Sequence, residues 1–365
     1  MKSMSMFQAI DAVAADADKS GQPHPRALDA LRSSELLGLT IPREYGGHGG
    51  NALDCNRRIA ELSGHDPSIA IIGFQHLSVA GRIVEFGTQE QKQKYLPRMA
   101  RGDLLAASAW SEKSAGANKQ RLATTAVPQS DGTWRLNGTK TFTTGAGMAG
   151  LYLVLVKTGD EDTSVAQYGA GGQSFFLVES ERAGVVTRTD LDLTGMRSSS
   201  TGFLELVDCQ LPATNLLAKL GGAAEVIARV RQCGLTLGAV SLGIAEAALE
   251  IACQSVRKLP VDSRQQHLAS ARLARMTLQV CATRALVERA GRRESNTVGR
   301  DTLAAKVFAS EVSEQVCRET QQMLGGSGFI RGTQIDRLVR DARAVALMGP
   351  VNDLALDLLA EEVLL

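Results

Sequence analysis

The chain has 365 residues, 44% of them apolar, which is long enough for two or three hydrophobic cores. Its 40 basic and 39 acidic residues give a net charge of +1, and only 4% of residues are aromatic, so neither nucleic acid nor an anionic membrane is an expected partner. The six cysteines and five histidines lack Cys-x-x-Cys or metal-ligand spacing, so we expect reduced thiols and no metal site. No run approaches about 20 apolar residues, so no transmembrane span is predicted.

Residues 1 to about 104 have the pattern of a helical domain. The stretch from Met1 to Lys19 mixes acids with alanines and has no continuous apolar core, which predicts an amphipathic helix and not a signal peptide. A cytoplasmic protein is therefore expected. Further along, Thr88 and Gln91 have the spacing of a capping box, which predicts that a helix begins there.

Residues 105 to 217 have the pattern of strands separated by Gly-rich or polar turns. Asn137-Gly138 lies between two short β-type stretches and predicts a hairpin turn. Further strands are predicted at three apolar runs, Leu151–Val156, Phe175–Val178 and Gly202–Val207. No helix of useful length fits between these strands, which favours an antiparallel sheet or a barrel over a doubly wound parallel sheet.

Residues 218 to 365 return to a helical pattern. Apolar side chains are so dense from Val226 to Ile244 that the helix expected there cannot be a one-sided surface helix. It is predicted to lie inside a bundle or in a subunit interface. A second helix is predicted around Leu303–Val316, where apolar residues recur every three or four positions, and Gly325-Gly326 is expected to end it.

The segment Ser108-Ala-Trp-Ser-Glu-Lys-Ser-Ala-Gly-Ala-Asn118 carries small hydroxyl residues and a glycine. Such a segment leaves backbone N–H groups accessible, which can bind pyrophosphate and hydrogen-bond a planar ring. The same residues also fit a strand that ends in a polar turn. Four other Gly-rich segments are typical of turns, since none has the GxGxxG form between a strand and a helix: Gly46–Gly50, Gly145–Gly150, Gly169–Gly172 and Gly325–Gly328.

Six motifs in the expected order resemble those of the acyl-CoA dehydrogenase superfamily, and they extend through nearly the whole chain. They are found in Gly38–Gly47, Phe86–Asp103, Leu136–Gly145, Gly195–Thr201, Leu324–Phe329 and Arg340–Arg343. Each motif alone is moderately specific, and their common order makes the resemblance highly specific. The resemblance implies an α+β, mostly α fold with a helical N-terminal domain (1–104), a β-barrel-like middle domain (105–217) and a C-terminal four-helix bundle (218–365).

The resemblance also implies a cofactor, non-covalent FAD, bound partly across a subunit interface of a homodimer or homotetramer. By position in the motifs, Ser108, Trp110 and Ser111 are expected along the flavin ring. Phe142, Thr143 and Thr144 are expected on its other side, with Thr144 near N5, although a hydroxyl satisfied by backbone is the alternative for Thr144. Cofactor contacts on the distal side, partly from a neighbouring subunit, are expected at Arg257, Gln322, Gly325 and Gly326, although Gln322 also fits a plain bundle surface.

The sequence departs from the family where a catalytic carboxylate is expected. The resemblance places the usual glutamate at Gly349 and a second base position at Cys233, and neither residue is a carboxylate. Asp353 is a possible substitute, but an acidic residue is also favoured in the first turn of a helix. Gly349 keeps a backbone N–H that could polarise a carbonyl. Further departures at Ala117, Asn118 and Leu259-Pro260 weaken the CoA and distal FAD patterns.

Three functions remain open at this stage. The first is dehydrogenation of an acyl thioester, acyl-CoA or acyl-carrier protein, in which a base removes the α-proton and a hydride leaves Cβ for the flavin. The second is a flavin monooxygenase or oxidase on the same scaffold, whose chemistry needs no α-proton abstraction. The third is a non-catalytic paralogue. An acyl substrate, small or carrier-bound, is the expected partner, and chain length is not evident.

Overall fold

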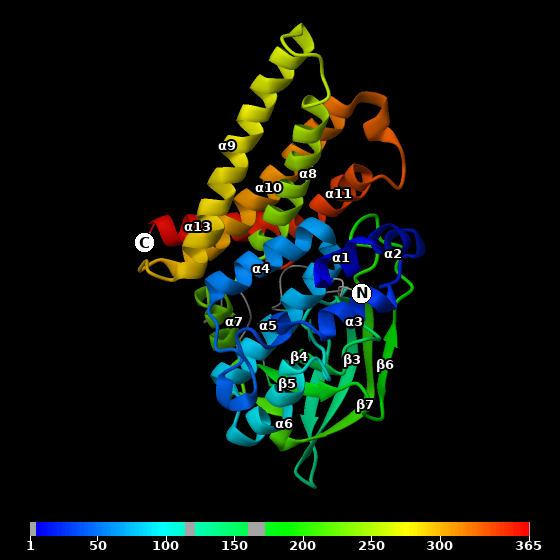
Figure 1. Ribbon diagram of the computed structural model, residues 1–365. Helices are drawn as coiled ribbons and strands as arrows, with labels where there is room; N and C mark the ends of the chain where they lie inside the picture. The colour runs from blue at the N-terminus through cyan, green and yellow to red at the C-terminus, as the bar shows by residue number, and fades with distance from the viewer. Residues whose placement is uncertain (1–4, 114–120, 160–171, 365) are drawn as a thin grey trace.

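The computed structural model describes residues 5–113, 121–159 and 172–364, and Figure 1 shows their arrangement. Ala117, Asn118 and Gly169–Gly171 lie outside the described residues. A group of helices begins the chain, a sheet occupies one end of the molecule, and long helices extend away from it at the other end. The predicted order of a helical, a β and a second helical region is confirmed, and so is the α+β, mostly α class.

The N-terminal helices are α1 Met6–Asp11, α2 Ala14–Ser20, α3 Pro25–Arg32, α4 Ala52–His65, α5 Pro67–Phe86 and α6 Gln89–Ala100, with short 3-10 helices at Glu35–Gly38 and Arg43–Tyr45. The predicted capping box at the start of α6 is confirmed. Gln91 N donates to Thr88 Oγ1 at 3.2 Å, and Thr88 N donates to Gln91 Oε1 at 3.0 Å. The two bonds satisfy backbone donors that a helix N-terminus leaves without partners.

One mixed sheet follows in the part of the chain that the structure describes. Its strands are β1 Ala106–Ala109, β2 Thr125–Pro128, β3 Thr133–Thr143, β4 Leu151–Lys157, β5 Gln173–Glu179, β6 Val185–Arg188, β7 Gly202–Pro212 and β8 Leu216–Leu217. Their order is β6-β7-β3-β2-β4-β5-β8, with β1 also paired to β4. Most pairs are antiparallel, and β4 pairs in parallel with β1 and β2. The predicted preference for antiparallel pairing over a doubly wound sheet therefore holds for most of the sheet.

The predicted hairpin turn at Asn137-Gly138 is wrong, because both residues lie inside the continuous strand β3. The pairing register of β3 with β7 shifts here, because the two steps from Leu136 to Gly138 face three steps from Cys209 to Leu206, so β7 carries a bulge opposite the dipeptide. The Asn137 side chain holds that bulge by accepting from Asp208 N at 2.8 Å. Gly138 is required there, since a Cβ would lie 2.6 Å from the Thr124 Cα and the φ angle is +144°. The residues that favour a turn also suit this strand position, because glycine admits the positive φ and the Asn137 side chain bonds across to the bulge on β7.

The C-terminal helices are α7 Ala223–Gln232, α8 Gly238–Val256, α9 Arg264–Arg292, α10 Val298–Leu324, α11 Gln334–Ala342, α12 Ala344–Leu347 and α13 Asn352–Leu364. The dense apolar stretch from Val226 to Ile244 forms two helices, α7 and α8, and not one. The chain breaks at Gly234, whose φ is +78° and where a Cβ would lie 2.5 Å from the Ala290 carbonyl oxygen. The long helices α8, α9 and α10 pack against one another, and α10 also contacts α11 and α13.

Helix α5 connects the parts of the molecule. Some of its side chains belong to the core that unites the N-terminal helices with α8 and α10, and others to the core shared with the sheet. Helices α5 and α8 are long and apolar enough to cross a membrane, but 67% and 56% of their most apolar stretches are buried inside the protein. Their burial identifies them as core helices of a soluble fold, so their apolar character serves packing.

Candidate functional site

The Ser-Trp-Ser segment after β1 lies directly beside the end of β3. Thr141 N donates to the backbone oxygen of Ser111 at 2.8 Å. Ser108 lies on β1, opposite Leu153 of β4. The two segments that the motifs predict on either side of a flavin ring are therefore adjacent in space.

A buried ion pair fixes this junction. Lys140 Nζ lies 2.6 Å from Glu112 Oε1, and the exposed fractions of the two residues are 0% and 4%. Ala123 N and Thr124 N also donate to the Glu112 carboxylate. Burial opposes ionisation of Glu112, but the Lys140 ammonium and the hydrogen bonds from Lys140, Thr124 and Ala123 together outweigh it and lower the pKa of Glu112. Burial lowers the pKa of Lys140 to about 8, so the pair is ionised at neutral pH.

The junction presents polar atoms that lack partners within the described part of the chain. Trp110 Nε1 and Thr143 Oγ1 are both buried and make no hydrogen bond there. Thr144 Oγ1 accepts from Thr201 Oγ1 at 3.3 Å, so a side chain and not the backbone is its neighbour. The Phe142 ring is 65% exposed and its φ is +52°, which is uncommon for a bulky residue. A planar ligand with hydrogen-bonding edges fits this set.

A neutral histidine attaches β1 to helix α5. His76 is fully buried, its Nδ1 accepts from Ala106 N at 3.3 Å, and its Nε2 lies 3.2 Å from the Leu37 oxygen. Burial lowers the pKa of His76 to about 4, so the ring stays neutral and can accept at one nitrogen while it donates at the other. The Trp110 ring packs 5.0 Å from the ring of Phe175. These contacts position the Ser-Trp-Ser segment.

The other expected cofactor residues lie elsewhere in this chain. Arg257 directly follows α8, its side chain is 72% exposed, and Glu250 is its ion-pair partner. Figure 1 shows the connection from α8 to α9 at the end of the bundle away from the sheet. Gln322, Gly325 and Gly326 are exposed where α10 ends. The end of α10 at Leu324 confirms the predicted helix stop. A single chain does not bring these four residues to the Ser-Trp-Ser segment.

The position of the usual base is a turn between α12 and α13. Gly349 is exposed in that turn, and Asp353 is exposed in the first turn of α13. Lys306 of α10 holds the turn, since its Nζ donates to the Pro350 oxygen at 2.7 Å and to Asn352 Oδ1 at 2.6 Å. Burial lowers the pKa of Lys306 to about 7. The turn thus offers backbone groups and one solvated carboxylate.

A cavity of about 730 Å³ lies between helix α5 and the start of the bundle, a volume typical of small-molecule sites. Cys233, the second base position, lines it. This cysteine is half-buried and its Sγ donates to the Val230 oxygen at 3.0 Å. Arg82 lines the same cavity. Sequence reasoning missed Arg82, Glu112 and Lys140, although a charged residue within an apolar stretch, as at Arg82, is a visible signal.

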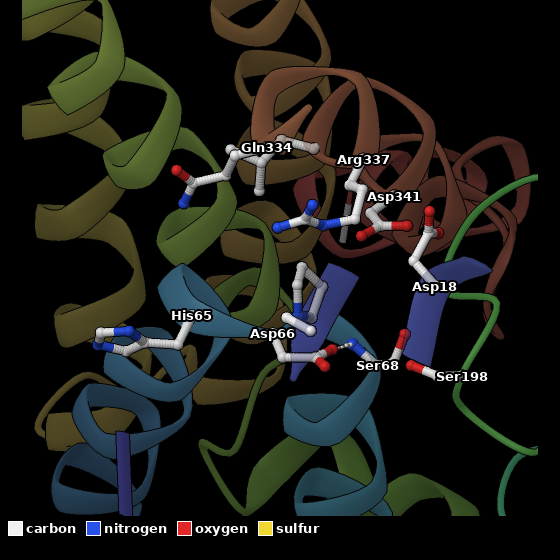
Figure 2. Close-up of a pocket in the computed structure, with 11 residues that line it drawn as sticks. Asp18, His65, Asp66, Ser68, Ser198, Gln334, Arg337 and Asp341 are labelled. Carbon is white, nitrogen blue, oxygen red and sulfur yellow. Dashed lines mark hydrogen bonds between the residues drawn. The ribbon is translucent and has the colours of Figure 1, made fainter. Parts of the chain in front are cut away.

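Another pocket, of about 20 Å³, has room for about one water molecule. Figure 2 shows the carboxyl groups of Asp18, Asp66 and Asp341 near the Arg337 side chain. Burial raises the pKa of Asp66 to about 6, although two backbone N–H groups of α5 donate to it. This pocket is a polar junction between α2, α5 and α11. Among the described residues no group of three or more His, Cys, Asp or Glu could hold a metal ion.

Three domain families match the chain in order. The N-terminal, middle and C-terminal domains of acyl-CoA dehydrogenases match residues 6–103, 107–209 and 222–364. An acyl-CoA dehydrogenase of Bacillus subtilis (strain 168) is 31% identical over 87% of this chain and 84% of the relative. An L-prolyl peptidyl-carrier-protein dehydrogenase of Pseudomonas fluorescens is 30% identical over 94% and 92%. The structure of butyryl-CoA dehydrogenase from Megasphaera elsdenii superposes with a TM-score of 0.87, at 28% identity, over 100% of both chains.

The three-part fold and the junction between β1 and β3 define a flavoprotein oxidoreductase. The unpartnered Trp110 Nε1 and Thr143 Oγ1 and the exposed Phe142 ring suit a flavin ring. The chain belongs to the acyl-CoA dehydrogenase family, and the expectation of FAD as its cofactor is confirmed by the three matching domains and the relatives.

Proposed function

We propose that this protein oxidises an acyl thioester between Cα and Cβ, with FAD as the two-electron acceptor. The hydrogen bond from Thr141 N to the Ser111 oxygen supports this proposal most directly, because it joins the two flavin-side segments. Family membership and the relatives that act on acyl-CoA or on a carrier-bound prolyl group support an acyl group held by CoA or by a carrier protein.

The residues of the junction would hold the flavin ring. Ser108, Trp110 and Ser111 would lie along one side, with the Trp110 indole N–H donating to an acceptor of the ring. Phe142, Thr143 and Thr144 would lie along the other side, and the Thr143 hydroxyl would supply a second hydrogen bond. Preorganised donors of this kind stabilise negative charge that develops on a ring during reduction.

Removal of the α-proton requires a proton acceptor other than the usual glutamate, and the Cys233 side chain as a thiolate, or Asp353, would take this proton. Gly349 would contribute its backbone N–H, which donates to the thioester carbonyl and makes the α-proton more acidic. Asp353 is the nearby carboxylate in the sequence, but its exposed place in the first turn of α13 is explained by the helix dipole. Cys233 lines the cavity and is the second candidate position.

Anaerobic mixing of the FAD-loaded protein with acyl-CoA thioesters tests the proposal. Loss of the flavin absorption band within seconds to minutes is the expected result. The variant Thr143→Val removes the unpartnered hydroxyl and should slow bleaching by about tenfold, the effect of about 1.4 kcal/mol. Thr187→Val changes a threonine at a sheet edge and is the matched control. Absence of bleaching with every CoA and carrier-protein thioester would contradict the proposal.

A flavin monooxygenase is the second candidate, because neither Gly349 nor Cys233 supplies a carboxylate. In that case the flavin would not bleach with thioesters, but the chemically reduced protein would consume O₂ rapidly in the presence of substrate. A protein that binds no added FAD would instead be the non-catalytic paralogue. Absorbance of the purified protein near 450 nm and an oxygen electrode distinguish these outcomes.

The protein is proposed to act as a homodimer or homotetramer. Gln322, Gly325 and Gly326, with Arg257, would contact the distal part of FAD from a neighbouring subunit. Large apolar side chains are exposed on the C-terminal half, as an interface requires: Leu268, Leu278, Phe329, Ile330, Leu347, Leu356, Val363 and Leu364. Light scattering should give a mass of two or four times 38.8 kDa, and a monomer at micromolar concentration would contradict this proposal.

The domain boundaries and the cellular location complete the proposal. Residues 1–104, 105–217 and 218–365 would be the three domains. The uninterrupted core between the N-terminal and C-terminal helices supports cooperative unfolding of these two, since Ser63 Oγ donates to the Val240 oxygen at 2.7 Å. A cytoplasmic location agrees with six cysteines that form no disulfide. Fractionation of cells that express the tagged chain checks it.

A further inference from the structure

Helix α5 has two functional faces. The residues of one face are His76, which bonds to β1, and Val79, Ala80 and Ile83, which belong to the core with the sheet. Trp110 packs against this core. The other face lines the cavity of about 730 Å³: Leu77, Ser78, Gly81 and Arg82. The spacing of each set follows the helical period. The helix therefore contacts both the core behind the flavin-side segment and the cavity.

Arg82 is a buried cation with too few partners. It is 4% exposed, and within the described residues it forms an ion pair between Nη2 and Glu85 Oε2 at 3.4 Å. Glu85 also pairs with Arg229 at 2.8 Å, so one carboxylate serves two guanidinium groups. Arg82 Nε and Nη1 have no hydrogen-bond partner in the described part of the chain. A guanidinium carries five N–H donors, and a buried charge without acceptors is costly.

Basic residues outnumber acidic ones in the rest of the cavity lining. Arg292 and Arg293 line it beside the single carboxylate among its lining residues, Glu294. Arg292 is engaged by Glu288 at 3.1 Å. The remaining lining is largely apolar or small, including Leu53 and Leu235. A cavity lined by more basic than acidic residues favours an anionic ligand and disfavours a cationic one.

We propose that this cavity holds the acyl end of a thioester that carries a carboxylate, and that Arg82 anchors this carboxylate. This inference rests on the proposed function and specifies its substrate class. A carboxylate offers two acceptor oxygens in the geometry that a guanidinium matches, which are the acceptors that Arg82 Nε and Nη1 lack. Acyl groups with an ammonium, such as an amino-acyl group, are disfavoured by the same charge. Arg82 is thus a specificity-determining residue.

A pair of thioesters with equal chain length tests the assignment. The FAD-loaded wild-type protein is compared anaerobically with glutaryl-CoA and valeryl-CoA, which both carry five-carbon acyl groups. We expect kcat/KM for bleaching to be at least tenfold higher with glutaryl-CoA. Arg82→Leu should remove this preference while it keeps or improves oxidation of valeryl-CoA, and Arg82→Lys should restore part of it. Arg58→Gln, an exposed arginine of α4 paired with Glu61, should keep the preference.

Equal rates for the two thioesters in the wild type, or equal losses for both in Arg82→Leu, would overturn the assignment and leave the proposed function intact. Failure of every thioester, including carrier-bound ones, would instead overturn the proposed function.

A binding measurement gives a readout that does not depend on oxidation. Thermal unfolding of the FAD-loaded protein is followed with glutarate and with its neutral analogue glutaramide, at equal ionic strength. Glutarate should raise the melting temperature of the wild type and of Arg58→Gln, but not that of Arg82→Leu, and glutaramide should raise none. A shift of equal size in wild type and Arg82→Leu would show that Arg82 is not the anion site and would overturn the proposal.

Discussion

Lys140 in strand β3 and Arg82 in helix α5 are both buried cations, but the protein provides them with different numbers of partners. Lys140 has a dedicated carboxylate at 2.6 Å. Arg82 shares a more distant carboxylate with a second arginine and leaves two nitrogens without partners. A buried charge whose ion-pair and hydrogen-bond partners are all supplied by the protein is consistent with a structural role. A buried charge without enough partners, such as Arg82, needs a ligand to complete its interactions. This contrast distinguishes a structural ion pair from a candidate binding residue.

The largest effect is expected when the Lys140–Glu112 ion pair is broken. Lys140→Met leaves the Glu112 carboxylate buried without a cation, so the free energy of unfolding should fall by about 3–5 kcal/mol. The double variant Glu112→Leu/Lys140→Met should recover part of this loss, because no charge remains buried. Urea unfolding of the FAD-loaded protein, followed by circular dichroism, measures both. Arg82→Met is the counterpart, and its stability should stay unchanged or rise; a loss as large as that of Lys140→Met would remove the contrast.

A second variant tests whether strand β3, which contains Lys140, requires a glycine at position 138. Gly138→Ala places a Cβ 2.6 Å from the Thr124 Cα at a φ of +144°. We expect the free energy of unfolding to fall by about 2–3 kcal/mol, the cost of a strained conformation together with a backbone displacement. Gly132→Ala also has a positive φ, of +82°, but meets no atom within 4 Å, so it should lose less. Equal losses in Gly138→Ala and Gly132→Ala would mean that the positive φ, and not the contact with Thr124, determines the cost.

Asp341 extends the comparison to a buried anion. Burial raises the pKa of Asp341 to about 7 from 3.8, although Met196 N donates to it at 2.5 Å. The folded state therefore holds the proton more tightly than the unfolded state, and stability is lost as pH rises from about 4 through about 7. Asp341→Asn keeps an acceptor without the charge. It should be more stable than the wild type by about 1–2 kcal/mol at pH 8 and equal to it near pH 4.

Melting temperatures measured from pH 4 to pH 8 test this prediction. A variant less stable than the wild type at pH 8 would show that the ionised carboxylate of Asp341 stabilises the fold.

The smallest effect is expected at an exposed carboxylate. Asp353→Asn changes a solvated residue of the first turn of α13, so stability should change by less than about 0.5 kcal/mol. The bleaching rate with an accepted thioester should stay within about twofold of the wild type. A general base contributes about 10²–10⁴-fold, so a loss of that size would identify Asp353 as the base and place the α12–α13 turn in the active site.

Local patterns predicted much of the fold. The capping box at Thr88 and the helix stop at Gly325 depend on residues a few positions apart, and such signals are readable along the chain. The Asn137-Gly138 prediction failed because a glycine with a positive φ is needed inside β3, where the chain passes close to Thr124, as well as in a hairpin turn. Pairing of β3 with β7, some 70 residues away, selected the bulge.

The sequence by itself determined the helical, β, helical order, the family motifs and the absence of a carboxylate at Gly349 and Cys233, because each is a property of residue identity or short-range pattern. Only the tertiary structure decided which buried charged side chains have enough ion-pair and hydrogen-bond partners. Lys140 meets Glu112 across 28 positions, whereas Arg82 faces a cavity assembled from helices that are distant in the chain. Such partnerships depend on long-range packing, which no local pattern specifies.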